Sequence, residues 1–234
     1  MITVMNREIE AYFQSPIGYV FLAVYYLFSG VFFFTNCLYY RTTDLSPVFT
    51  SQFTVQLFLI PMLTMRLMSE ERRNKTDQAL LTAPLSLTAM VMGKFFAAVF
   101  VLFTAESIIL VYALVISRFA APYWPVFWGC FTANLLLGMA LVSIGTFISS
   151  LTENQVIAAV GGYGAALFFL LIDSLRAIFV NPVLDKLIAS ISLLNRYTSF
   201  SLGIFRYDHI LFFISVCVVF IFLTVRVFEK RRWG

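Results

Sequence analysis

The composition of this 234-residue chain excludes a soluble globular protein. Hydrophobic residues make up 61% of it and charged residues only 12%, about half the charged share of soluble domains, and the mean hydropathy is +0.90. The net charge of +4 is weak evidence for nucleic-acid binding, and in a membrane protein the placement of basic residues matters more than their sum. We therefore predict an all-α integral membrane protein with no nucleic-acid partner.

Residues 1–16 predict a short helix that lies in the membrane interface. Apolar side chains recur at helical spacing through this stretch, while the polar residues from Asn6 to Glu10 occupy other faces. The alternative is a frayed terminus. Ser15 and Pro16 mark a turn before the first long apolar segment.

Six apolar segments follow, each long enough to cross a hydrocarbon core. They cover residues 17–40, 50–68, 93–117, 124–150, 156–179 and 209–228. Pro61 should kink the second segment. The fourth ends in a ladder of small residues that lets a neighbouring helix approach closely: Gly138, Ala140, Ser143, Gly145 and Ser149.

Basic residues set the predicted orientation of the six spans. Ten Lys and Arg residues fall on the side that holds both chain ends and the loop 69–92, against six on the other side. Because basic residues are retained on the cytoplasmic side, we predict that both termini and this loop are cytoplasmic. The outer segment 180–208 then predicts one or two amphipathic or re-entrant helices, since a seventh span would place the basic tail outside.

The chain lacks the sequence motifs of nucleotide binding and of common hydrolases. No phosphate-binding GxxxxGK[ST] loop, GxSxG elbow or HExxH pair occurs. His209 is the single histidine, and the three cysteines lack metal-ligand spacing, so we interpret the cysteines as small apolar fillers. We predict no catalytic residue, cofactor or metal on this chain.

Two acidic residues lie within predicted spans, where a charged side chain is costly unless it is paired or hydrated. Asp173 precedes Arg176 by three residues, so the two can neutralise each other near the outer surface. Glu106 has no partner in its own span. It either faces a polar cavity between subunits, or is protonated and bonded to Ser or Thr on another helix, and we treat both residues as candidate pathway groups.

The loop between the second and third spans contains a predicted helix of about two turns at residues 76–83. Thr76 or Asn74 can cap it, Asp77 suits the positive end of its dipole, and Pro84 ends it. So short a helix is marginal in water on its own. A further structure must therefore stabilise it.

Two adjacent leucines on this helix, Leu80 and Leu81, need a surface that buries them. That surface is either a groove on a partner protein or the bilayer interface. The residues alone leave these alternatives equal.

The order and spacing of several short motifs resemble the permease subunit of a type-2 ATP-binding-cassette (ABC) exporter, in the branch that includes gliding-motility-type permeases. The resemblance extends over essentially the whole chain. It is carried by Glu8, Tyr12, Phe13, Ser15, Pro16, Gly18, Tyr19, Arg66, Glu70, Glu71, Arg72, Thr76, Leu80 to Pro84, Gly93, Lys94, Ser192 to Leu194, Phe200, Gly203 and Asp208. The sequence departs from the pattern at residues 195–197, where a His-Phe-like pair is expected.

The resemblance implies one six-helix permease domain over residues 1–234 that dimerises with an identical or related copy in a bacterial inner (plasma) membrane. Two separate cytosolic ABC ATPase subunits would bind ATP and Mg. Residues 76–83 would be the coupling helix that docks on the ATPase, with Glu70, Glu71 and Arg72 at its entry. The second and fifth spans would line the pathway. The sequence does not specify the substrate.

Three other classes remain as alternatives. An ATP-independent secondary transporter is typically built from internal repeats, and this chain shows none. A membrane enzyme would need clustered catalytic side chains. A non-catalytic membrane scaffold fits the composition equally well.

Overall fold

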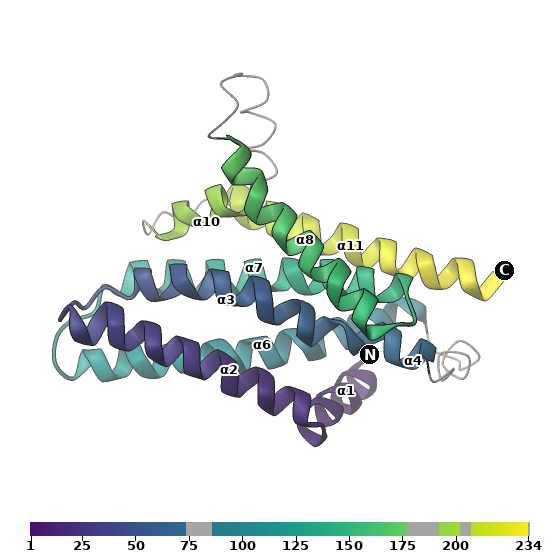
Figure 1. Ribbon diagram of the computed structural model, residues 1–234, viewed down its shortest axis with the longest axis horizontal. Coiled ribbons are helices and arrows are strands. Elements are labelled where there is room, and N and C mark those ends of the chain that lie inside the picture. Colours follow the sequence, from purple (N-terminus) through teal and green to yellow (C-terminus); the bar gives the residue numbers. More distant parts are fainter. Residues whose placement is uncertain (74–85, 177–191, 202–206, 234) are drawn as a thin grey trace.

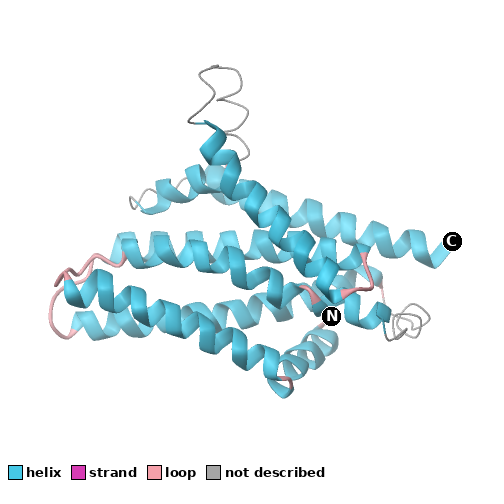
Figure 2. Ribbon diagram, in the orientation of Figure 1, coloured by secondary structure: helices cyan, strands magenta, loops and turns pink. Residues whose placement is uncertain are grey.

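The protein is an all-helical membrane protein in a computed structural model that describes residues 1–73, 86–176, 192–201 and 207–233. Within these ranges every regular element is helical, and none is a strand (Figure 2). Six helical segments are long and apolar enough to cross a membrane, which confirms the predicted number of spans.

A short helix and the first two spans occupy the N-terminal third of the chain. Helix α1 covers Ile2–Gln14, and α2 (Pro16–Phe33) continues through a π-helical segment (Phe34–Tyr39) to form the first span. Helices α3 (Ser46–Thr64) and α4 (Arg66–Arg73) form the second. The helical path continues past Pro61 and is interrupted at Met65, one turn later.

The four later spans are α6 (Leu87–Ser117), α7 (Trp124–Leu151), α8 (Gln155–Arg176) and α11 (Tyr207–Trp233), and α10 (Leu193–Ser201) is a short helix before the last of them. The second span is therefore helical as far as Arg73 and the third begins at Leu87, so the connection between them is shorter than the predicted 69–92. Of the predicted outer segment 180–208, only α10 and the start of α11 lie within the described residues.

Helix α7 is the centre of the bundle. It contacts α3, α4, α6, α8, α10 and α11. In its 18-residue apolar stretch 67% is buried, the same share as in the second span, whereas only 22% of the corresponding stretch is buried in α8 and in α11. The predicted ladder of small residues is buried on α7. A side-chain carbon added at Gly145 would lie 2.2 Å from the Thr64 hydroxyl, so the absence of a side chain there permits the contact between α3 and α7.

Both chain ends and α4 lie toward the same end of the bundle (Figure 1). Hydrogen bonds support this arrangement, because Arg7 on α1 reaches Glu71 on α4, and Arg231 on α11 reaches the Ser150 carbonyl on α7. All three cysteines are buried free thiols, as expected of apolar fillers. Helix α1 thus contacts α4 near its end, and α11 contacts α7 at the Ser150 carbonyl.

Candidate functional site

A network of charged and hydroxyl side chains surrounds α4. It joins α4 to α1, α6, α7 and the turn that precedes α8, and we call it the α4 network. Its members are Arg7, Glu8, Tyr12, Ser15, Arg66, Glu70, Glu71, Arg72, Lys94, Ser149 and Glu153.

The most deeply buried charge of the α4 network is the ammonium group of Lys94, whose side chain is 2% exposed. Its Nζ lies 3.2 Å from a Glu8 carboxylate oxygen and 3.0 Å from one of Glu71, and it donates to the Leu67 carbonyl at 2.8 Å. These three partners belong to α1 and α4, while Lys94 belongs to α6. One ammonium group therefore joins three helices that are distant in sequence.

Helix α1 can reach Lys94 because it lies directly against α6. A side-chain carbon added at Gly93 would come within 3.0 Å of Val4 and 3.1 Å of the Met1 carbonyl. The two acids beside Lys94 also share Arg7, whose guanidinium lies 2.8 Å from Glu8 and 3.0 Å from Glu71. Two cations thus stand against two anions, and the cluster is close to neutral.

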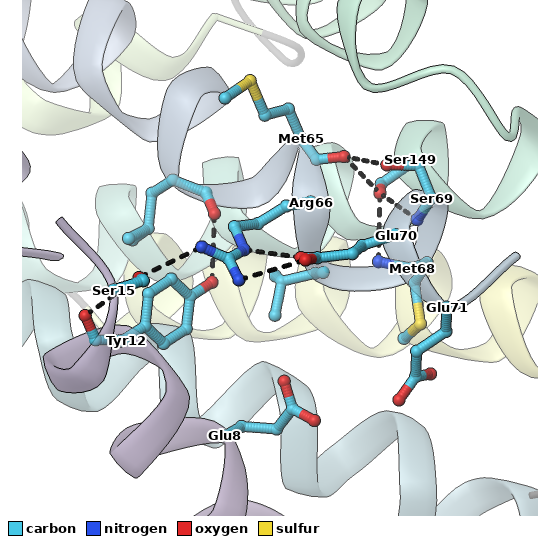
Figure 3. Close-up of polar contacts among 12 residues, drawn as sticks. Glu8, Tyr12, Ser15, Met65, Arg66, Met68, Ser69, Glu70, Glu71 and Ser149 are labelled. Carbon is cyan, nitrogen blue, oxygen red and sulfur yellow. Dashed lines mark hydrogen bonds and ion pairs between the residues drawn. The ribbon is translucent and has the colours of Figure 1, made fainter. Parts of the chain in front are cut away.

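A second set of contacts ties the start of α4 to the turn between α1 and α2. Arg66 donates hydrogen bonds from two nitrogens to the Glu70 carboxylate, at 2.7 and 3.3 Å, and a third to the Ser15 hydroxyl at 3.1 Å (Figure 3). Tyr12 donates its phenol to the Leu63 carbonyl at 3.0 Å. Burial raises the pKa of the Tyr12 phenol well above its ordinary range, so this group stays a hydrogen-bond donor.

The break between α3 and α4 is satisfied by a hydroxyl from α7. Ser149 accepts hydrogen bonds from the backbone amides of Met68 and Ser69, at 3.2 and 3.1 Å, and donates to the Met65 carbonyl at 3.0 Å (Figure 3). The first amides of a helix have no partner within the helix. Ser149 supplies that partner from another span, so the position of α4 is fixed by α7.

The end of α4 is joined to the turn between α7 and α8. Arg72 lies 2.9 Å from Glu153. Its second nitrogen is 3.5 Å from the Ser150 carbonyl, which also accepts a 2.6 Å hydrogen bond from Arg231 on α11. A displacement of α4 would therefore act on α7 and, through the Ser150 carbonyl, on α11.

The predicted coupling residues fall on both sides of the described boundary. Glu70, Glu71 and Arg72 all lie in the α4 network. The remaining predicted coupling residues lie outside the described residues: Thr76, Asp77, Leu80, Leu81 and Pro84. The docking of residues 76–83 stays a prediction.

Of the two acids predicted to lie within the membrane, the structure describes the side chain of Glu106 and not that of Asp173. Asp173 lies in α8, and its side chain is outside the described residues, as is that of Arg176. Glu106 is fully buried, and its Oε1 accepts a 2.5 Å hydrogen bond from the Gln56 amide on α3. Its hydrogen-bond partner on another helix is therefore the Gln56 amide, whereas Ser or Thr was one of the two alternatives drawn from the sequence, and its role in a pathway stays a prediction.

Sequence reasoning did not single out Lys94, Glu8 or Ser149 as a connected site. Glu8 and Lys94 entered only through the family resemblance, and Ser149 only as a small residue. A detectable signal existed, because a lysine beside a glycine in the first turns of an apolar span requires a counter-ion. The partners of Lys94 are Glu71, 23 residues away, and Glu8, 86 residues away. No local pattern in the sequence identifies them.

The α4 network contains no arrangement suited to covalent chemistry. Its groups are ion pairs and backbone caps, and the described residues hold no group of three or more His, Cys, Asp or Glu side chains that could bind a metal ion. The α4 network fixes one short helix against several longer ones. No protein-family description and no characterised protein matches the sequence.

Proposed function

We propose that this chain is the membrane-spanning permease subunit of an ABC transporter that works as an exporter. ATP hydrolysis on two separate cytosolic ATPase subunits would drive it, and two permease copies, identical or related, would form the transporter. The observation that supports this proposal best is the α4 network. It connects the entry of the predicted coupling segment to α1, α6, α7 and the turn before α8 through polar contacts, of which those of Lys94 are the most buried.

The α4 network suits the transmission of force from a partner. Residues 74–85 are joined to α4 at one end and to α6 at the other, and Lys94 on α6 contacts Glu71 on α4. A partner that moved this segment would therefore move α4 and α6 together. Since the chain has no nucleotide-binding motif of its own, the energy for transport would come from such a partner.

The proposed pathway follows the second and fifth spans. An open groove of about 360 Å³ lies between α3 and α8, and its walls expose only apolar surface. It is lined by Leu57, Phe58, Tyr163, Ala166, Leu167 and Leu170. Such a surface suits an amphipathic or lipid-like cargo, and a second permease copy facing it would complete the pathway.

In the proposed orientation, the α4 network and both termini face the cytoplasm of a bacterial cell. The chain would be a multi-pass protein of the inner membrane. Arg226, Lys230 and Arg231 at the end of α11 lie at the same end as the α4 network, which agrees with basic residues being retained on the cytoplasmic side.

The docking of residues 76–83 is tested by a double substitution, Leu80→Asp with Leu81→Asp, in the chain co-expressed with a candidate cytosolic ABC ATPase. We expect co-purification of the ATPase and substrate-stimulated ATP hydrolysis both to fall at least tenfold, because two acids cannot occupy an apolar groove. Gln78→Asp is the matched control, since it adds an acid to the same helix and spares both leucines.

Two results would contradict the proposal. Normal co-purification and hydrolysis in the double variant would remove the docking claim. An absence of ATP-dependent flux in vesicles that contain the permease and the ATPase would favour a scaffold or an ATP-independent transporter. A melting temperature close to wild type in the isolated double variant would exclude misfolding as the cause of uncoupling.

A further inference from the structure

A second polar cluster lies in the middle of the bundle and takes no part in the α4 network. It contains Tyr25 on α2, Gln52 and Gln56 on α3, and Glu106 on α6, and we call it the Glu106 cluster. All four side chains have no exposed surface. The Gln56 amide nitrogen donates to Glu106 at 2.5 Å, and the Tyr25 hydroxyl lies near both glutamines and the carboxylate.

The Glu106 cluster presents more oxygen atoms than the protein satisfies. Glu106 Oε2, Gln56 Oε1 and Gln52 Oε1 form no hydrogen bond with any described residue, and neither does Gln52 Nε2, while the Tyr25 hydroxyl lies close enough to interact with both glutamines. Buried polar atoms in folded proteins are almost always paired. Three unpaired acceptor oxygens on α3 and α6, with the Tyr25 hydroxyl of α2 beside them, therefore indicate a ligand that binds oxygen.

The charge of the Glu106 cluster indicates the charge of that ligand. Glu106 makes no ion pair within the described part of the chain, and a lone carboxylate at this depth in a membrane requires a counter-charge. One carboxylate balances one positive charge, whereas a divalent ion would leave an excess charge in the hydrocarbon. A bound proton would satisfy Glu106 Oε2 and one acceptor, but a metal cation contacts several oxygens at once.

We propose that the Glu106 cluster binds a single monovalent metal cation. The ligands would be the Glu106 carboxylate, the side-chain oxygens of Gln52 and Gln56, and the Tyr25 hydroxyl. Hard cations of this kind take carboxylate, amide and hydroxyl oxygens. The bound cation would join α2, α3 and α6 and would stabilise their packing whatever the chain transports, so the inference is independent of the proposed function.

The test is a thermal unfolding series of the purified full chain in detergent at fixed ionic strength, with sodium chloride replacing choline chloride. We expect the melting temperature to rise with sodium and to saturate. Glu106→Gln should abolish this response, and Gln52→Leu should raise the half-saturating sodium concentration at least tenfold. Glu229→Gln is the matched control, because it makes the same substitution at a partly exposed site on α11 and should retain the response.

Potassium chloride and pH complete the experiment. A saturable response to potassium that Glu106→Gln also abolishes would support the same site. A wild-type melting temperature that is equal in choline and sodium would overturn the proposal, and a dependence on pH alone would identify a proton as the occupant. An equal response to sodium in wild type and Glu106→Gln would show a general salt effect and would also overturn it.

If Glu106→Gln fails to fold, Gln52→Leu decides the question alone. An unchanged half-saturating concentration in that variant would then overturn the proposal.

Discussion

Lys94→Met removes the central charge of the α4 network while it keeps an unbranched side chain of similar length. The ammonium is 2% exposed and lies about 3 Å from two carboxylates, which are themselves only 15% and 14% exposed. Removing one partner of a buried ion pair typically destabilises a protein by about 3–5 kcal/mol. Here Glu8 and Glu71 remain partly exposed to solvent and still share Arg7. We therefore expect the free energy of unfolding to fall by about 2–3 kcal/mol.

The assay is reversible unfolding in mixed micelles with increasing denaturing detergent. Arg226→Met is the matched control, because Arg226 also pairs with a glutamate, at 2.6 Å, but its side chain is 61% exposed. Such an exposed pair should contribute about 0–1 kcal/mol. The difference between the two variants therefore measures the effect of burial rather than of charge loss.

A double-mutant cycle separates the ion pair from the packing of the lysine side chain. Lys94→Met combined with Glu71→Gln removes both charges, so the double variant should be more stable than the sum of the two single losses predicts, by about 1–2 kcal/mol. The reasoning would be refuted if Lys94→Met lost no more stability than Arg226→Met, or if the cycle gave no coupling.

Two further substitutions test how α4 and α3 are held against α7. Ser149→Ala removes the hydrogen bonds that Ser149 accepts from the Met68 and Ser69 amides, and the one that it donates to the Met65 carbonyl, which keeps the Ser69 hydroxyl as a donor. We therefore expect a loss of about 1–3 kcal/mol; the exposed Ser117→Ala should change stability by less than about 0.5 kcal/mol, and equal losses would contradict the capping role. Gly145→Ala forces a carbon against Thr64 and should destabilise the protein by about 1–3 kcal/mol. Gly164→Ala is its control, since a carbon added there meets no atom within 4 Å, and similar unfolding free energies for the two alanine variants would contradict the close packing of α3 and α7.

The spans could be predicted from sequence because their signal is local. Twenty consecutive apolar residues force a helix in a membrane, where each backbone group must bond within its own segment. The small residues of α7 could likewise be predicted to permit close packing. The break after Pro61 could not be placed from sequence. Helices α3 and α4 separate at Met65, where Ser149 of a distant span forms hydrogen bonds with backbone groups at the break.

Most polar contacts between helices could not be predicted, because they join residues that are far apart in the chain. Gln56 meets Glu106 across 50 residues and Glu8 meets Lys94 across 86. Composition indicates that a buried charge needs a partner, but not which of many polar residues supplies it. The choice depends on how the helices rotate about their axes, and that rotation is set by the packing of all the spans together.

The position of Lys94 has a consequence for the order of events during synthesis. Glu8 and Glu71 are made before Lys94, so neither acid has its buried counter-ion until the start of the third span has been synthesised. Helix α1 consequently reaches its final position on α6 only after residue 94 has been synthesised, although α1 precedes α6 in the chain. The ion pair between α1 and α6 can therefore form only once part of the third span exists.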